Sequence, residues 1–273
     1  MSKSLGKLGI GVRPATPSFS CLAVFLLVLA ACSARAPNGP DLNPLGEVLP
    51  ENAQEPAARS LQPGEYATEK GWGRLQVIRQ GADLLFSLDT VTGEDSCALS
   101  GEVKDGLGIA KEDSIPAVCL LSFSQGGQGV EISARTQADC RHFCGYNAGF
   151  EGTYLSVQSG CRHHEIQQTR KGFEQLYNDK NYKPALAKLS PILEDCLATL
   201  EWEEEGSIRN DLAIAQYKNG LFGECLETLS QYAEDVKRDD DEISEKWTPA
   251  LADRYLSIVK AARTNIDLCA KSN

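Results

Sequence analysis

The side chains of this chain best suited to do chemistry are its cysteines and histidines. Ten cysteines and three histidines occur in 273 residues. His142, His163 and His164 lie in no metalloprotease helix motif, no Gly-x-Ser-x-Gly turn and no phosphate-binding loop. Cys140 and Cys144 could join His163 and His164 in a zinc site, but in an exported protein such a cysteine pair is more often disulfide-bonded. We therefore predict no enzyme activity, no cofactor and no metal site.

Cys32 differs from the other cysteines because it ends a short apolar run. Residues 21–31 are apolar and follow a basic start, an order that is typical of a secretory signal. A bilayer-spanning helix would need about 20 apolar residues, so the run is too short for one. The last four residues of this stretch, Leu29-Ala30-Ala31-Cys32, resemble the lipobox of bacterial lipoproteins.

This resemblance implies cleavage before Cys32, so that residues 1–31 are a lipoprotein signal peptide, and acylation of Cys32 as the lipid attachment site. Each buried methylene contributes about 0.8 kcal/mol, so two or three acyl chains such as palmitate form a durable membrane anchor. The alternative is a soluble secreted protein in which Cys32 is incidental. Ser33, and not Asp, follows the cysteine, which in the lipoproteins that this sequence resembles favours transfer to the outer membrane. We expect a lipid-anchored protein of the bacterial envelope at the outer membrane, facing the periplasm.

The charge of the chain limits its partners. There are 27 basic and 38 acidic residues, a formal charge of −11, and loss of the three basic residues in the signal makes the mature charge −14. Nucleic-acid binding requires clustered Lys and Arg, so we predict no nucleic-acid partner and expect a basic envelope protein. One acidic segment is a possible protein-docking patch, with solvated loop charge as the alternative. It comprises Glu201, Trp202, Glu203, Glu204 and Glu205.

Eight cysteines remain after Cys21 leaves with the signal and Cys32 is acylated. An even number in an oxidising compartment predicts up to four disulfide bonds, for which about 105 pairings exist. Proximity within each expected domain favours four pairs: Cys97 with Cys119, Cys140 with Cys144, Cys161 with Cys196, and Cys225 with Cys269.

Three segments follow the predicted signal. Residues 32–63 are rich in proline and form a tether. In residues 64–158 apolar positions alternate, as at Leu75 and Val77, and turn signals such as Asp105-Gly106 separate seven or eight short runs. This pattern predicts a small antiparallel β-barrel or sandwich, and we favour the barrel because each strand has one apolar face. Residues 162–271 have a helical period, so the predicted fold class is α+β.

The helical segment contains an internal repeat of 40 residues. In each copy an aromatic ends one helix and a second aromatic, followed by a small residue, begins the next. This resembles the tetratricopeptide repeat, which implies paired helices with a concave binding face. A final helix from about Ser244 to Cys269 would cap the stack. The repeated positions are Tyr177 and Tyr217, Tyr182 and Phe222, Ala185 and Cys225, Leu186 and Leu226, and Leu189 and Leu229.

The β segment also resembles the small barrels of periplasmic lysozyme inhibitors in size, strand pattern, cysteines and lipid anchor. The Ser-Gly-x-x-Tyr and Tyr-x-x-x-Thr-Lys-Gly loops of those inhibitors do not occur here, so no site residue is carried over. We predict a non-enzymatic protein-binding module or scaffold. The alternative is an inhibitor or immunity protein against a basic peptidoglycan hydrolase.

Overall fold

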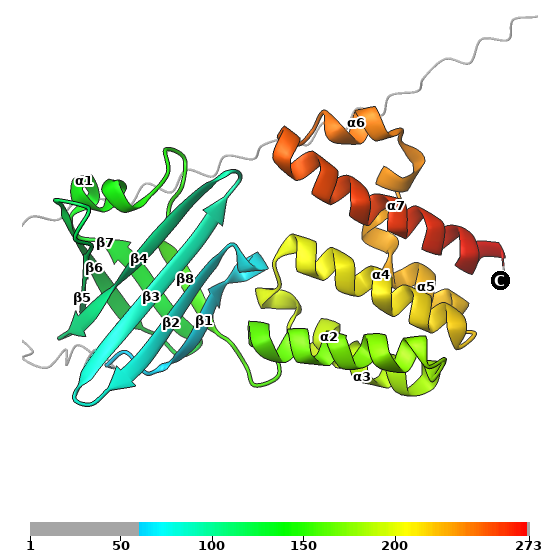
Figure 1. Ribbon diagram of the computed structural model, residues 1–273, viewed down its shortest axis with the longest axis horizontal. Helices are drawn as coiled ribbons and strands as arrows, with labels where there is room; N and C mark the ends of the chain where they lie inside the picture. The colour runs from blue at the N-terminus through cyan, green and yellow to red at the C-terminus, as the bar shows by residue number, and fades with distance from the viewer. Residues whose placement is uncertain (1–59, 272–273) are drawn as a thin grey trace, which may run out of the picture. The chain divides into compact units, whose positions relative to one another are not determined.

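The computed structural model describes residues 60–271, which lie within one compact unit. The fold class is α+β, as predicted: eight antiparallel strands form a barrel, and helices follow it in the chain (Figure 1). Cys32, the predicted signal peptide (1–31) and nearly all of the predicted tether (32–63) lie outside the described residues, so these remain predictions.

The barrel is a simple meander in which every strand pairs with its neighbours in the chain. The first strand also pairs with the last, so the sheet closes and leaves no free edge. The strands are β1 (Gly64–Thr68), β2 (Gly73–Gln80), β3 (Asp83–Thr92), β4 (Asp95–Lys104), β5 (Leu107–Lys111), β6 (Val118–Gln125), β7 (Gly129–Ala134) and β8 (Gly152–Ser156).

Alternating apolar side chains fill the inside of the barrel. Leu75 and Val77 of β2 are buried together with Phe86 and Leu88 of β3, and the ring of Phe86 packs edge-on against Phe123. One apolar face per strand gives a single filled interior, which confirms the prediction of a barrel over a sandwich.

The turn between β4 and β5 shows how the sequence sets the register. Asp105 and Gly106 both have positive φ, 53° and 75°, which matches the twist of a two-residue hairpin.

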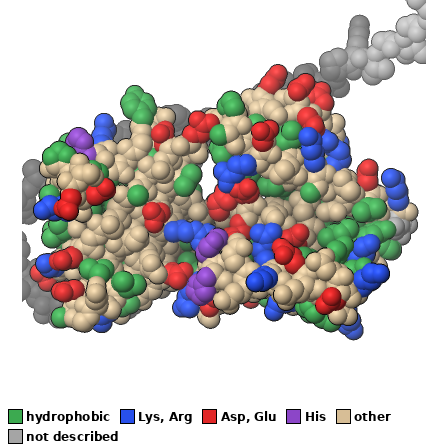
Figure 2. Space-filling model, viewed as in Figure 1, with side chains coloured by type: hydrophobic (Ala, Val, Ile, Leu, Met, Phe, Trp, Pro, Cys, Tyr) green, Lys and Arg blue, Asp and Glu red, His purple; other side chains and the backbone are tan. Residues whose placement is uncertain are grey.

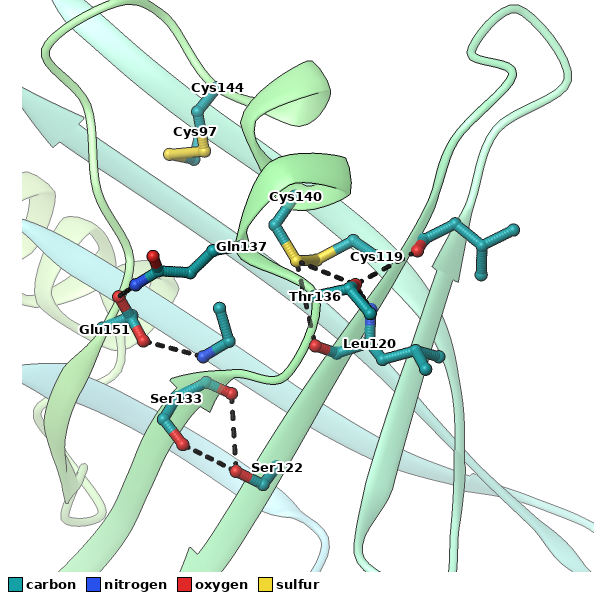
Figure 3. Close-up of a disulfide and its surroundings, with 12 residues drawn as sticks. Cys97, Cys119, Leu120, Ser122, Ser133, Thr136, Gln137, Cys140, Cys144 and Glu151 are labelled. Atoms are coloured by element: carbon teal, nitrogen blue, oxygen red, sulfur yellow. Dashed lines mark hydrogen bonds between the residues drawn. A yellow bond between two sulfur atoms is a disulfide. The ribbon is translucent and has the colours of Figure 1, made fainter.

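Two of the four predicted disulfides are wrong. The barrel segment contains Cys97–Cys144 and Cys119–Cys140 bonds in place of Cys97–Cys119 and Cys140–Cys144 (Figure 3). Strand β5 separates β4, which carries Cys97, from β6, which carries Cys119. The three-residue turn η2 (Arg141–Phe143) places Cys140 beside β6 and Cys144 beside β4. The prediction from proximity in sequence failed because the order of the strands in the barrel decides which cysteines lie close together.

The helical segment begins with two helical hairpins and ends with one long helix (Figure 1). Its second hairpin is shorter than its first, because α5 has 7 residues where α3 has 14 and a three-residue turn follows it. The helices are α2 (His163–Asn178), α3 (Tyr182–Asp195), α4 (Trp202–Lys218), α5 (Phe222–Thr228), α6 (Asp240–Ser244) and α7 (Pro249–Lys271); the four-residue α1 (Gln137–Cys140) lies after β7.

The two hairpins have equivalent interiors. Ala185 and Cys225 occupy matching positions early in the second helix of each hairpin, and both are fully buried. At the matching turns the aromatic rings of Tyr177 and Tyr182 lie 5.3 Å apart. A small residue at this position lets the two helices of a hairpin approach closely, as the 40-residue repeat predicts.

The disulfides of the helical segment are those predicted from the sequence. Cys161–Cys196 joins the residues before α2 and after α3, and Cys225–Cys269 joins α5 to the end of α7. All four of these cysteines are buried. The first bond closes the α2–α3 hairpin, and the second joins two helices that are not consecutive in the chain.

Candidate functional site

Tyr146 is the most exposed large hydrophobic or aromatic side chain in the described part of the chain. It is 98% exposed, whereas Val91, the next most exposed, is 57% exposed. Tyr146 lies near the middle of residues 144–150, which we call the Tyr146 loop. An aromatic ring that is fully exposed to water offers apolar surface that a protein partner could bury.

Both ends of the Tyr146 loop are fixed to the barrel. At its start Cys144 is bonded to Cys97 of β4. At its end Phe150 is buried in the barrel core, and its carbonyl accepts a 2.7 Å hydrogen bond from the hydroxyl of Tyr154. The hydroxyl of Thr90 also donates to the carbonyl of Gly149 at 2.8 Å.

The carboxylate of Asp95 holds the middle of the loop. Its Oδ2 accepts from both the backbone N–H and the side-chain amide of Asn147, each at 3.1 Å. Gly145 donates its N–H to the carbonyl of Ser96 at 2.8 Å, and a Cβ at Gly145 would lie 2.5 Å from Oδ1 of Asp95. These bonds hold the backbone on both sides of Tyr146, which lies at the tip of the turn.

A groove lies beside the loop, between it and α1. Its volume is about 650 Å³, and its lining includes Gln137 and Arg141 together with the loop itself. Figure 3 shows how α1 is attached: Cys140 is bonded to Cys119, Thr136 accepts from the N–H of Leu120, and Glu151 accepts from Gln137. Two disulfides therefore fix both the groove and the exposed ring beside it.

The acidic segment of residues 201–205 forms the first turn of α4. The side chain of Glu201 accepts from the N–H of Glu203 and caps the helix, and burial raises the pKa of the Glu201 carboxyl above its usual value. Glu205 is buried and pairs with Arg209 at 2.7 Å and with Lys70 of the barrel at 3.7 Å. These carboxylates are neither free nor fully solvated.

The remaining residues of the segment also have partners inside the protein. Glu204 lies 3.7 Å from both Arg74 and His163, and Glu203 forms an ion pair with Arg254. The guanidinium of Arg254 lies 5.5 Å from the centre of the Trp202 ring. A docking role for residues 201–205 stays a prediction, but most of their charge is neutralised within the chain.

The junction of the barrel and the helices is built around one glycine. The turn η1 (Glu69–Gly71) contacts η3 (Leu197–Thr199), and Gly71 has a φ of 64°. A Cβ at Gly71 would lie 2.6 Å from the backbone N of Glu201 and 2.7 Å from the carbonyl oxygen of Thr199. Only glycine permits this backbone conformation and this approach together.

A cleft of about 710 Å³ opens beside this junction, and we call it the junction cleft. In Figure 2, basic, acidic and histidine side chains gather along this hollow. Four of its residues are acidic and four carry Lys or Arg, so opposite charges face one another there. The lining includes Lys70, Trp72, Arg74, Asp89, Val91, His163, Gln167, Arg170, Glu201, Trp202, Glu203, Glu204, Ser207, Leu251 and Arg254.

The structure does not bring the histidines and cysteines together as a zinc site. Cys140 and Cys144 are each in a disulfide bond, so neither is a thiolate ligand. His163 lies beside Glu204, and His142 and His164 are exposed. Among residues 60–271, no group of three or more His, Cys, Asp or Glu side chains is arranged to hold a metal ion.

Comparison with protein-family models, curated proteins and solved structures found no match. The four disulfides indicate an oxidising, extracytoplasmic compartment. No helix in the described part of the chain is both long enough and apolar enough to cross a bilayer.

Sequence analysis did not identify Tyr146. The available signal was an aromatic residue between Gly145 and Asn147, two turn-forming residues. An aromatic in such a loop has no strand or helix face to join. Its full exposure depends on the disulfide and the Asp95 contacts, which the sequence alone does not reveal.

Proposed function

We propose that this chain is a lipid-anchored bacterial envelope protein that binds another protein and catalyses no reaction. The observation that carries the proposal is the fully exposed Tyr146 on a loop fixed by a disulfide and by Asp95. Tyrosine is enriched among the residues that dominate protein interfaces. A loop already ordered in the free protein loses little entropy on binding, which increases affinity.

The composition supports the proposed location and the kind of partner. The lipobox-like Leu29-Ala30-Ala31-Cys32 and the following Ser33 favour an acyl anchor in the outer membrane, with the body in the periplasm. A mature charge of −14 favours association with a basic envelope protein by electrostatic steering. The paired helices, which resemble tetratricopeptide repeats, would add a second protein-binding surface.

Replacing Tyr146 with alanine tests the proposal. We expect affinity for the partner to fall about 30-fold, the effect of removing a central interface aromatic worth about 2 kcal/mol. The thermal stability should stay unchanged, because the ring makes no contribution to the core. Ile78→Ala is the matched control, since Ile78 is also exposed but lies on β2. The partner is first captured from crosslinked envelopes, and its affinity is then measured with each purified variant.

Asp95→Ala gives a second, independent test of the same surface. It leaves Tyr146 in place but removes both hydrogen bonds to Asn147, so binding should weaken through loss of order in the loop. A partner that binds the wild type and both Tyr146→Ala and Asp95→Ala equally well would exclude this loop as the binding surface.

An inhibitor of a basic peptidoglycan hydrolase is the second candidate. A narrow, fixed loop with a protruding aromatic has the shape that fits an enzyme cleft, whereas a scaffold needs no such shape. Purified mature protein should then slow the lysis of cell walls by lysozyme-type enzymes, and Tyr146→Ala should restore lysis. Unchanged lysis at all protein concentrations supports the scaffold.

Cys32→Ala tests the anchor. We expect it to abolish incorporation of labelled palmitate and to leave unprocessed precursor in the inner membrane, because the signal peptidase of lipoproteins acts at the modified cysteine. Ser33→Ala, at the neighbouring position, should still be labelled. Processing of Cys32→Ala to a soluble periplasmic form in normal amount would show that Cys32 is not the acylation site.

A further inference from the structure

Two residues that line the junction cleft each carry one buried polar atom with no hydrogen-bond partner within residues 60–271. The two atoms are Nε of Arg170, a donor on α2, and Oε2 of Glu204, an acceptor on α4. The Glu204 side chain is 9% exposed, so it is more than nine-tenths buried. The nearest cation to Oε2 is Nη2 of Arg74 at 3.7 Å, which is too long for a hydrogen bond.

The other atoms of these side chains are held in place by neighbours on both helices. Oε1 of Glu204 accepts from Nε2 of Gln167 at 3.1 Å, and Nη2 of Arg170 donates to Ser207 at 2.6 Å and to Asp211 at 3.1 Å. Gln167 of α2 therefore lies opposite Glu204 of α4, and Arg170 lies opposite Ser207. The unpartnered donor and acceptor are offset along the helices by about one turn, roughly 5 Å.

A buried donor or acceptor without a partner costs free energy, and this cleft contains one of each. A ligand that accepts from Arg170 and donates to Glu204 would remove both costs. The cleft is lined by four acidic residues and four Lys or Arg residues, some of them paired, as in Glu203 with Arg254, so a strongly anionic or cationic ligand would meet repulsion from one side. The complementary ligand is neutral and carries both a donor and an acceptor.

The peptide unit has this chemistry. Its carbonyl and N–H lie in one plane and point in opposite directions, and so reach two groups on different helices better than a single hydroxyl does. The indoles of Trp72 and Trp202 and the side chain of Leu251 line the same cleft and would contact apolar side chains of the ligand. We propose that the junction cleft binds an extended peptide segment, with Arg170 donating to a peptide carbonyl and Glu204 accepting from a peptide N–H.

The two atoms are buried in the free protein, so the proposed contacts require a local shift of the Arg170 and Glu204 side chains. This site is separate from the Tyr146 loop and does not depend on it. The loop contributes no residue to the junction cleft, whose lining comes from β2, β3, the β3–β4 turn, α2, α4 and α7, together with residues 70–72 after β1 and Glu201 before α4.

Nuclear magnetic resonance of the full chain tests the proposal directly. The probe is a blocked alanine tripeptide, with N-acetylglucosamine trimer as a sugar probe, and the readout is the Nε–H resonance of Arg170. We expect the tripeptide to shift this resonance saturably. Glu204→Gln, which keeps the shape but loses one acceptor oxygen, should weaken tripeptide binding about tenfold. Glu227→Gln, at an exposed position on α5, should leave it unchanged.

Arg170→Lys provides a second variant that retains the positive charge but lacks the Nε donor, and it should also weaken binding, which is followed here through the indole N–H resonances of Trp72 and Trp202. Tyr146→Ala should bind the tripeptide as the wild type does, which separates this site from the proposed docking loop. A shift with the sugar trimer in place of the tripeptide would overturn the assignment to peptides. No shift with either probe would overturn the site itself.

Discussion

Replacing Gly71 with alanine is expected to destabilise the protein by about 3 kcal/mol and to disrupt the contact between the barrel and the helices. An alanine with φ near 64° carries a strain of about 1 kcal/mol or more. Its Cβ would also lie within 3 Å of backbone atoms of Thr199, Leu200 and Glu201. Backbone cannot rotate away as a flexible side chain does, so overpacking adds about 2 kcal/mol.

Gly81→Ala is the matched control for this prediction. Gly81 has a φ of 62°, almost the same as Gly71, but no atom lies within 4 Å of a Cβ built there. It should therefore show only the strain of about 1 kcal/mol. Thermal unfolding gives the difference in stability, and hydrogen exchange should show lost protection near residues 199–201 in Gly71→Ala alone. Equal effects of the two substitutions would mean that the close approach at Gly71 does not stabilise the junction.

Removing the Cys225–Cys269 disulfide is expected to cost about 4 kcal/mol and to unfold the helices before the barrel. The bond closes a loop of 44 residues, for which the chain-entropy model gives about this value. The helices depend on it because α5 is short and because two hairpins are fewer than the three repeats usually needed for a stable stack. The double variant Cys225→Ala/Cys269→Ala avoids a free thiol, and its helical circular-dichroism signal should melt at a lower temperature.

The double variant Cys97→Ala/Cys144→Ala is the matched control, because its disulfide spans 47 residues and has nearly the same expected entropic effect. It should instead expose the Tyr146 loop and its surroundings to hydrogen exchange, and leave the melting of the helices unchanged. If Cys225→Ala/Cys269→Ala left the helical melting temperature at its wild-type value, packing of α7 against α4 would be the main source of stability in the helical segment.

Local patterns in the sequence predicted the elements of the fold correctly. Alternation at Leu75, Val77, Phe86 and Leu88 predicts strands with one buried face, and the structure buries these side chains inside the barrel. The 40-residue repeat predicts two similar hairpins, and Ala185 and its counterpart are fully buried in them. Such predictions succeed because they depend on the period of a strand or helix, which neighbouring residues determine.

The partners of individual residues could not be predicted in the same way. Cys97 and Cys119 are separated by 21 intervening residues but lie on strands that do not pair, so the bond between them does not form. Glu204 and Glu205 belong to an acidic run that suggests a solvated or docking surface, but Arg74 and Lys70 of the barrel lie next to them. In both cases the deciding neighbours come from more than 20 residues away.

The sequence by itself determined the class of this protein: a strand-rich segment, then paired helices, eight cysteines that pair with one another, and a lipobox-like motif at Cys32. Periodicity and composition depend on neighbouring residues in the chain, so they can be recognised from the sequence alone. The tertiary structure decided what is exposed and what is paired. It alone placed Tyr146 on a fixed loop, set Glu204 against Arg74, and left a donor and an acceptor unpartnered in one cleft, because these arrangements depend on strand order and on the packing of distant elements.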